Sequence, residues 1–443
     1  MEKEFTTASR IEIERDQILT ALRSGTVPRS GIDKIRVGRT EEIRELLKDS
    51  DRISGGGASI RFLMGEFGSG KSFLLQLARE VAFGKKLIVA KGDLTDSRSL
   101  RTTTGSESSI YQVLMDSLST KQRPDGGALG PILNDYFDAC AEEATNEHVN
   151  PLVLIEQRVS PLKDFTGGHD YVKILMTYWQ GYDSGDEAIK DAALEWLRGS
   201  IKTIRDARAQ LGVRSIVNDA SYFDVLKLHA RLFRLAGYGG LLVQIDELTT
   251  VARLVNRESR AKNYDRILSF VNDINQGLVS GLGLQLAGTL ETLTDPRRGL
   301  YSYPALQSRL AENTFAVNGR NDLSGPVIRL KPLTPDEILV LLLRIRGVFD
   351  TGRTGESVVP EEAVTGFLLT ESRRVGFLSH VTVRDLIIRF VGFLSIAERY
   401  PQDSWQDILV KAPTSGDDAS PATNDTRRLG EMQDGDGFTR VEF

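Results

Sequence analysis

The sequence predicts an α/β protein built on a parallel β-sheet that helices cover on both faces. Five short apolar segments have strand length and end in polar residues, at 59–64, 87–90, 241–245, 284–287 and 327–330. Segments with the apolar spacing of helices separate them. Buried strands that alternate with helices along the chain are typical of parallel sheets packed on both sides.

The composition indicates a globular protein, with 40% apolar and 26% charged residues among 443. The net charge of −5 gives no bulk attraction to nucleic acid or to an anionic membrane, so any such contact requires a local basic patch. A single cysteine, Cys140, excludes an internal disulfide, and four scattered histidines indicate no structural zinc. Without a signal peptide or a run of ~20 apolar residues, we expect a cytoplasmic protein with no membrane partner.

A phosphate-binding loop is the strongest functional signal. It matches G-x-x-x-x-G-K-[ST] and lies between a predicted strand and a predicted helix at 72–81, the context that this motif requires. Its glycines let backbone N–H groups turn toward phosphates, and the helix N-terminus adds partial positive charge. We expect Lys71 to contact the β- and γ-phosphates of ATP, and Ser72 to hold Mg²⁺. The loop residues are Gly65, Glu66, Phe67, Gly68, Ser69, Gly70, Lys71 and Ser72.

An acidic pair, Asp246 and Glu247, follows the third apolar segment. A bound Mg-nucleotide needs a carboxylate at the carboxyl end of a neighbouring strand. We expect Asp246 to reach the metal through water or through Ser72, and Glu247 to orient and deprotonate the attacking water. An apolar run followed by two acids is otherwise common at strand ends, so the interpretation depends on the phosphate loop.

Three later residues extend the predicted catalytic set. Thr289 ends the fourth apolar segment and could hydrogen-bond the attacking water or the γ-phosphate; an ordinary strand-end threonine is the alternative. Arg309 first, and Arg298 second, are candidates for a guanidinium that stabilises transition-state charge in a neighbouring subunit. Taken singly, each arginine is more often a solvated or salt-bridged surface residue.

Further contacts to the nucleotide are expected from outside the sheet. Arg384 stands near the start of a predicted helix at 381–399 and could report the phosphate state, with a surface salt bridge as the alternative. Val37 and Gly38 precede a predicted helix at 41–48, where backbone and apolar atoms could enclose adenine.

The order of these motifs resembles that of AAA+ ATPases, closest to the origin-recognition and helicase-loader branch. It runs from Val37-Gly38-Arg39 through the phosphate loop, Asp246-Glu247 and Thr289 to the arginines and the segment 327–337. More narrowly, segments 21–29, 118–129 and 295–299 are similar to the ATP-binding proteins of BREX phage-resistance systems, of the BrxD type.

This resemblance, which covers most of residues 15–400, implies partners as well as a fold. Relatives accompany a helicase and other phage-defence proteins, and we expect nucleotide-dependent assembly with other copies of the chain. Initiator relatives usually carry a C-terminal winged-helix domain, whereas the residues after Arg399 in this sequence are mostly tail-like, so we do not expect DNA binding through a wing. Any DNA contact is therefore expected to be indirect or to involve the assembled oligomer.

The residue patterns and the resemblance together divide the chain into four parts, although the long helical insertion departs from the minimal AAA+ core. We expect an N-terminal helical segment at 1–36 and a P-loop AAA+ domain at 37–333 with a long helical insertion at about 101–235. A helical lid follows at 334–400, and a flexible acidic tail at 401–443, whose last seven residues alternate like a strand.

Three functions remain open at this point. The complete set of residues predicts an ATP-hydrolysing switch that loads or regulates a DNA-processing partner. A nucleotide-gated scaffold that recruits partners with little hydrolysis would use the same pocket. A DNA-binding adaptor with a decayed site is the third, and the intact Lys71, Asp246 and Glu247 argue against it.

Overall fold

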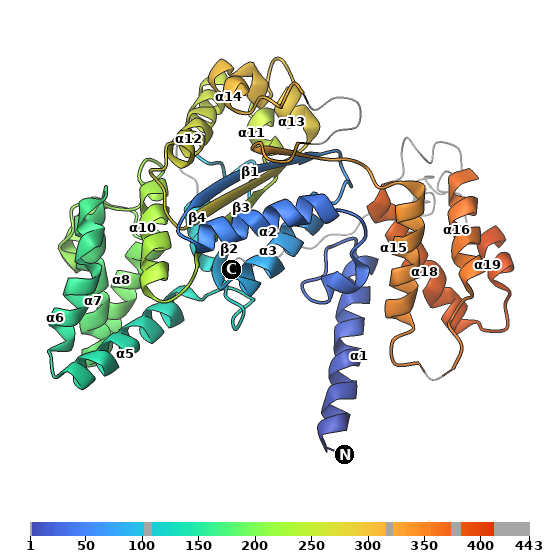
Figure 1. The fold of residues 1–443 in the computed structure, drawn as a ribbon, viewed down its shortest axis with the longest axis horizontal. Helices are drawn as coiled ribbons and strands as arrows, with labels where there is room; N and C mark the ends of the chain where they lie inside the picture. Colours follow the sequence, from blue (N-terminus) through green and yellow to red (C-terminus); the bar gives the residue numbers. More distant parts are fainter. Residues whose placement is uncertain (1, 102–108, 316–321, 354, 374–381, 412–443) are drawn as a thin grey trace, which may run out of the picture.

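A five-stranded parallel sheet forms the centre of the computed structural model (Figure 1). The structure describes residues 2–101, 109–315, 322–353, 355–373 and 382–411. The strand order is β2-β3-β4-β1-β5, and every pairing is parallel. All five predicted strands are confirmed, as β1 Ala58–Gly65, β2 Leu87–Asp93, β3 Gly240–Asp246, β4 Leu282–Gly288 and β5 Val327–Leu330.

Helices cover both faces of this sheet, because alternate side chains of each buried strand point to opposite sides. Leu63 of β1 packs with α2 (Thr40–Ser54) and α3 (Lys71–Gly84). Phe62 and Met64 belong instead to the large core on the opposite face, with α10 (Tyr222–Leu235) and α12 (Arg257–Asn275). The predicted α/β class is therefore confirmed.

A buried amide on β3 hydrogen-bonds both to α3 and to the neighbouring strand. Gln244 of β3 donates from Nε2 to the carbonyl oxygen of Leu75 at 2.7 Å and to Oε1 of Gln285 on β4 at 2.9 Å. Buried amide groups require such partners. The bond to Leu75 ties α3 directly to β3.

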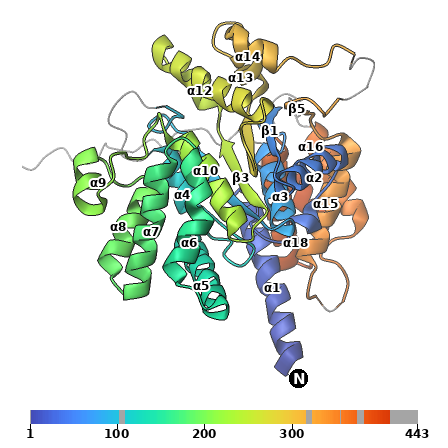
Figure 2. The same ribbon diagram turned by 60° about the vertical axis from the view of Figure 1, so that its left-hand side comes forward.

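A helical insertion separates β2 from β3 and lies at one end of the molecule, shown in green in Figures 1 and 2. Its core is continuous with that of the sheet, so it is not a tethered module. Before α10 it comprises α4 (Ile110–Asp116), α5 (Leu129–Glu147), α6 (Pro151–Val159), η2 (Ser160–Asp164), α7 (Gly168–Ser184), α8 (Glu187–Arg198) and α9 (Ile204–Leu211).

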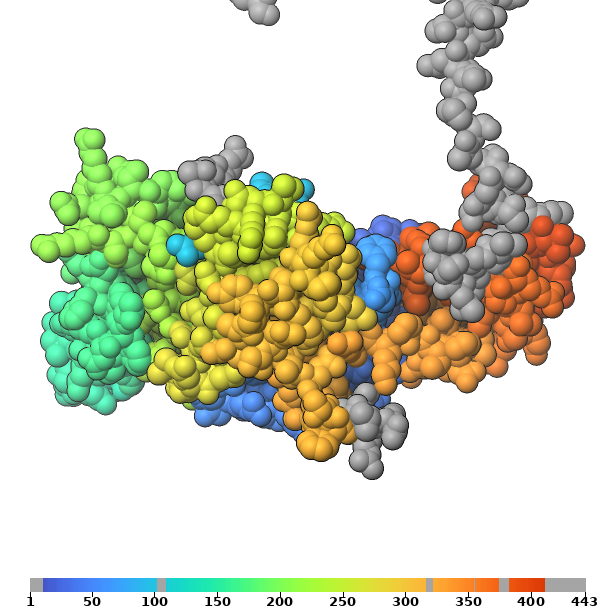
Figure 3. All heavy atoms as spheres, turned by 90° about the horizontal axis from the view of Figure 1, so that it is seen from above, coloured from blue at the N-terminus to red at the C-terminus, as the bar shows by residue number. Residues whose placement is uncertain are grey.

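A lid, of which the structure describes four helices, lies at the other end of the molecule, as the view from above shows (Figure 3). Its second hydrophobic core includes Ile18, Leu19 and Leu22 of α1, so the two ends of the described chain pack together. The helices are α15 (Pro335–Phe349), α16 (Glu361–Arg373), α18 (Val383–Arg399) and α19 (Trp405–Lys411), joined by α1 (Glu2–Arg23) and η1 (Ile32–Ile35).

Helix α19 differs from the expectation of a flexible tail from residue 401. It packs on α16 and α18, and the Trp405 ring lies so close to Gly366 that a Cβ there would come within 2.5 Å of it. The large aromatic surface of one residue therefore extends the lid beyond Pro401. Residues 412–443, including the strand-like end, lie outside the described residues.

Short helices complete the carboxyl edge of the sheet: α11 (Thr249–Arg253), α13 (Leu290–Thr294), η3 (Leu300–Ser302) and α14 (Pro304–Arg309). Together with α12 they occupy the top of Figure 1. In the described ranges, no helix is both long and apolar enough to cross a membrane.

Candidate functional site

The phosphate loop joins the end of β1 to the start of α3 and closes tightly on itself. Gly68 and Gly70 have φ of +79° and +88°, a backbone region that favours glycine. Gly65 is equally constrained, because a Cβ there would lie 2.4 Å from the Ser69 hydroxyl. That hydroxyl is buried and has no hydrogen-bond partner among the described residues.

Lys71 points back into the loop that precedes it. Its Nζ donates to the carbonyl oxygens of Gly65 and Glu66, each at 2.9 Å. Burial lowers the pKa of Lys71, while the nearby carboxylates of Asp246, Glu247 and Glu66 raise it. The amine is therefore held at the phosphate loop within reach of the acidic pair.

Asp246 and Ser72 meet across the sheet, although β4 separates β3 from β1. The Ser72 hydroxyl donates to Oδ2 of Asp246 at 2.8 Å, and the backbone N–H of Glu247 donates to Oδ1 at 2.9 Å. Both oxygens of this buried carboxylate are thus engaged. The parallel register brings the two residues together, because parallel strands present their carboxyl ends at one edge.

Glu247 differs from its neighbour in backbone and environment. Its φ of +60° is unusual for a residue with a side chain and indicates that tertiary contacts impose the turn at the end of β3. The side chain is exposed, and among the described residues no hydrogen bond or ion pair holds its carboxylate. Glu247 therefore presents a free carboxylate at the site.

A pocket of about 160 Å³ connects these groups to the lid and the N-terminal segment. Its polar end is formed by the phosphate loop from Phe67 to Ser72, by Asp246 and Glu247, and by Arg39 and Arg384. Its apolar part is formed mainly by Leu22, Val27, Pro28, Ile35, Val37, Phe73, Leu333, Leu341, Val383 and Ile387.

The lid touches the phosphate loop through the start of α18. Thr382 caps this helix in a capping box with Asp385, and a Cβ on Gly68 would lie 2.8 Å from the Thr382 Cβ. The guanidinium of Arg384 lies over the Phe67 ring, 5.3 Å from its centroid. Two helix N-termini, those of α3 and α18, therefore meet at the loop.

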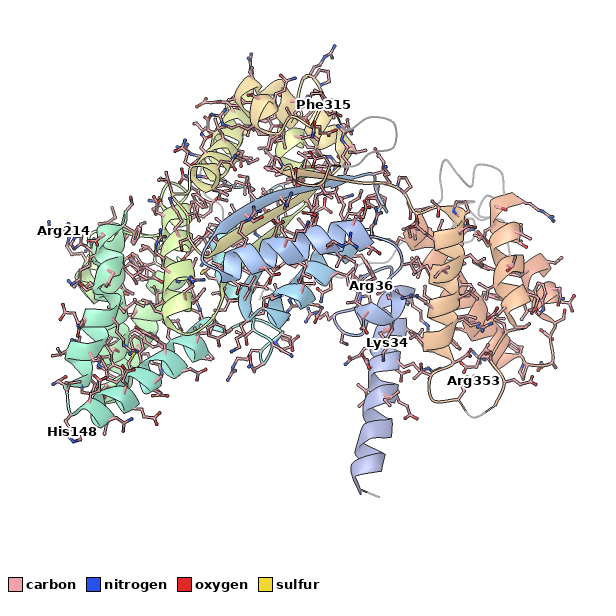
Figure 4. The ribbon with its side chains drawn as sticks, in the orientation of Figure 1. Lys34, Arg36, His148, Arg214, Phe315 and Arg353 are labelled. Atoms are coloured by element: carbon pink, nitrogen blue, oxygen red, sulfur yellow. The ribbon has the colours of Figure 1, made fainter. Side chains whose placement is uncertain are left out.

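The N-terminal segment is tied to the same loop by Arg39. Its Nη2 donates to the carbonyl oxygen of Ser69 at 2.9 Å, and also to that of Lys331. Gly38 does not line the pocket; it packs against α15, where a Cβ would meet Oε1 of Glu337 at 2.5 Å. The segment between α1 and α2, marked by Lys34 and Arg36 in Figure 4, thus lies beside both the sheet domain and the lid.

A comparison with protein-family models matches residues 11–412 to the BREX system ATP-binding protein BrxC/D. The chain belongs to this BrxC/D family. Membership makes it an ATP-binding protein of the BREX phage-defence system and associates it with the other components of that system. A search of curated proteins finds no match.

The remaining predicted residues of this BrxC/D protein lie outside the pocket walls. The Thr289 hydroxyl caps α13 by accepting from the N–H of Thr292 at 3.2 Å. Arg298 and Arg309 are exposed near α12. Arg309 donates to Asn272 Oδ1 and to the Ala305 carbonyl. The Arg298 guanidinium makes no hydrogen bond or salt bridge in the described part of the chain, although its charge acts on Asp295.

Sequence reasoning assigned no separate role to Arg39 or Phe67 in this BrxC/D site. Both are set by contacts between segments distant in sequence: Arg39 with Ser69 and Lys331, and Phe67 with Arg384. The only local signal in the sequence was that Arg39 belongs to the Val37-Gly38-Arg39 motif and Phe67 to the phosphate loop. The roles expected for Thr289, Arg298 and Arg309 stay predictions.

Proposed function

We propose that this BrxC/D protein hydrolyses Mg-ATP in the pocket between the sheet, the lid and the N-terminal segment. The observation that carries the proposal is the meeting of the Ser72 hydroxyl with the Asp246 carboxylate, 2.8 Å apart, beside a phosphate loop. An unpaired carboxylate, Glu247, lines the same end of the pocket.

The electrostatics of the polar end suit a polyphosphate. The start of α3 presents backbone N–H groups and the positive end of the helix dipole. Burial is the main cause that lowers the pKa of Lys71, and the nearby positive charge of Arg384 lowers it further, so two cations lie near one another. An anion with several charges between them would relieve this repulsion, and the apolar part of the pocket would receive the base.

The residues present also fit a magnesium ion. Mg²⁺ prefers oxygen ligands and is usually held by one or two protein groups, with phosphate oxygens and water completing its shell. The Ser72 hydroxyl and the Asp246 carboxylate would hold it. The ion would supply charge neutralisation between the β- and γ-phosphates. In the described part of the chain, no cluster of three metal-ligating side chains offers a site independent of the substrate.

The two acids divide the chemistry according to their environments. Asp246 has both oxygens engaged in hydrogen bonds and is held in one orientation. Glu247 is free of such bonds in the described residues, so its carboxylate can orient a water molecule and accept its proton. Arg309 or Arg298 would complete the site of a neighbouring copy. Because no hydrogen bond or salt bridge holds the Arg298 guanidinium among the described residues, Arg298 becomes a stronger candidate for this role.

We further propose that hydrolysis drives a switch that loads or regulates a DNA-processing partner, such as a helicase, in phage defence. The close approach of the lid to the loop supports such coupling, since Thr382 leaves no room for a Cβ on Gly68. A scaffold that binds ATP with little hydrolysis uses the same contacts and is the second candidate.

Replacing Glu247 with Gln separates binding from hydrolysis. The variant should bind Mg-ATP normally in calorimetry, while phosphate release slows by about 10²- to 10⁴-fold, the usual contribution of a general base. Glu291→Gln, an exposed acid on α13 away from the pocket, is the matched control.

Two results would change the conclusion. Wild-type-like turnover in Glu247→Gln would remove the assigned role of this carboxylate. Negligible phosphate release by the native protein, alone and with DNA and BREX partners, would favour the scaffold. Particle mass measured with a non-hydrolysable ATP analogue tests assembly, and loss of activity in Arg309→Ala or Arg298→Ala with intact nucleotide binding would identify the arginine that acts between copies.

A further inference from the structure

The phosphate loop carries an aromatic side chain that its chemistry does not require. Phe67 occupies a variable position of the G-x-x-x-x-G-K-[ST] motif, and 67% of its surface is exposed. It belongs to none of the hydrophobic clusters among the described residues. Its ring therefore contributes little to the core.

The partner of this ring is a cation from another part of the chain. Arg384, in the first turn of α18, places its guanidinium 5.3 Å from the Phe67 ring centroid. The aliphatic part of the same side chain lies against Gly25 of the N-terminal segment, where a Cβ would come within 3.2 Å of it. Within the described residues, no salt bridge or hydrogen bond holds the guanidinium.

The stack therefore determines where the Arg384 charge lies. A planar guanidinium is attracted to the negative face of an aromatic ring. Without the ring, the long side chain would have no fixed position, and repulsion from the Lys71 ammonium would favour solvent. Thr382 touches Gly68, so the ring and the guanidinium belong to one contact between the loop and the lid.

We propose that Phe67 is a positioning residue that holds Arg384 at the phosphate end of the pocket, so that the site distinguishes ATP from ADP. This inference rests on the proposed function, because it assigns the triphosphate to the same pocket. A cation held in place loses little freedom when a terminal phosphate arrives, which increases affinity for the ligand that carries that phosphate. ADP lacks this terminal phosphate, so the fixed cation increases its affinity less.

The role depends on aromatic character and not on bulk alone. Leucine at position 67 would keep an apolar side chain but would offer no negative face to the guanidinium. Tryptophan would keep that face and is the strongest cation–π partner among the aromatic residues. Because Phe67 is exposed, neither change removes core packing.

The test is calorimetry on the full-length protein with Mg²⁺ and either a non-hydrolysable ATP analogue or ADP. Phe67→Leu should lower the ratio of the two affinities by about two- to fivefold, the factor expected for a cation–π contact at an exposed site. Phe67→Trp should retain the ratio. In an Arg384→Gln background, Phe67→Leu should have no further effect, because the cation it positions is gone.

Phe315→Leu is the matched control, since Phe315 is 81% exposed and lies far from the lid (Figure 4). An unchanged ratio of ATP-analogue affinity to ADP affinity in Phe67→Leu would overturn the inference. The inference would also fail if Phe67→Leu lowered that ratio equally with Arg384 present and in the Arg384→Gln background. A changed particle mass with an unchanged ratio would assign the ring to contacts between copies and also overturn it. If the native protein bound neither nucleotide, the proposed function itself would fail, a result distinct from these.

Discussion

A fully buried histidine in the insertion predicts sensitivity to acid. His229 of α10 accepts a hydrogen bond at Nδ1 from the Tyr171 hydroxyl, 2.8 Å away, and its Nε2 lies 2.9 Å from the Tyr111 oxygen. Tyr111 donates its proton to the carbonyl oxygen of Leu197, so Nε2 must carry the hydrogen of a neutral imidazole. A second proton, at Nδ1, would disrupt this network.

Burial lowers the pKa of His229 from 6.5 to about 4 and raises the pKa of Tyr111 and Tyr171. The unfolded chain therefore takes up the proton first as pH falls. This contribution to stability is complete above pH 6.5 and is lost progressively as pH falls toward 4. The interval from 6.5 to about 4 corresponds to about 3 kcal/mol at ~1.36 kcal/mol per pH unit.

Unfolding by urea, followed by tryptophan fluorescence between pH 7.5 and 4, measures this effect, because Trp179 and Trp196 are buried in the insertion. The native protein should lose about 3 kcal/mol more over this range than His229→Gln, which has no titrating imidazole. His148→Gln, at an exposed position, should keep the native slope. Equal pH dependence in the native protein and in His229→Gln would refute the reasoning.

Two further substitutions test the loop and the sheet. Gly68→Ala combines a φ of +79° with a Cβ 2.8 Å from Thr382, so Mg-ATP affinity in calorimetry should fall about tenfold or more. The control is Gly127→Ala, with φ +67° and open space around it, which should leave the Mg-ATP affinity unchanged. Native affinity in Gly68→Ala would show that the lid contact is dispensable. Asp49→Ala removes the carboxylate that pairs with the buried Arg61 at 2.6 Å and should cost about 3–5 kcal/mol in denaturant unfolding; a loss below about 1 kcal/mol, the size expected for a surface pair, would mean that water reaches the guanidinium.

The sheet and the phosphate loop were predictable because their signals are local. Each strand is a nearly continuous buried run, and the loop is a contiguous motif between a strand and a helix. The contact of Ser72 with Asp246 also followed, since parallel strands present their carboxyl ends at one edge. These predictions do not depend on how the helices pack against one another.

Apart from Arg384, which was expected near the nucleotide and lines the pocket, the lid contacts could not be predicted, because they join residues far apart in sequence. The apolar stripe of α1 indicates a buried face, but the sequence around Ile18 and Leu22 does not indicate that this face packs on the lid. Thr289 illustrates a competing local signal. A threonine three residues before another hydroxyl residue can cap a short helix, and its hydroxyl is engaged in that way here.

The packing of α1 with the lid determines what a movement at the nucleotide site would displace. Ile18, Leu19 and Leu22 share the lid core, and Arg15 donates to the Phe349 carbonyl at 2.9 Å. A rotation of the lid relative to the sheet must therefore carry α1 with it or expose that apolar surface to water, which opposes separation. Arg39 ties the following segment to the phosphate loop. The backbone would therefore bend between η1 and α2 during such a rotation, where Gly38 and Arg39 have positive φ. The projecting α1 (Figure 1), whose N-terminal half is far from the phosphate loop, would thus move with the lid in such a rotation.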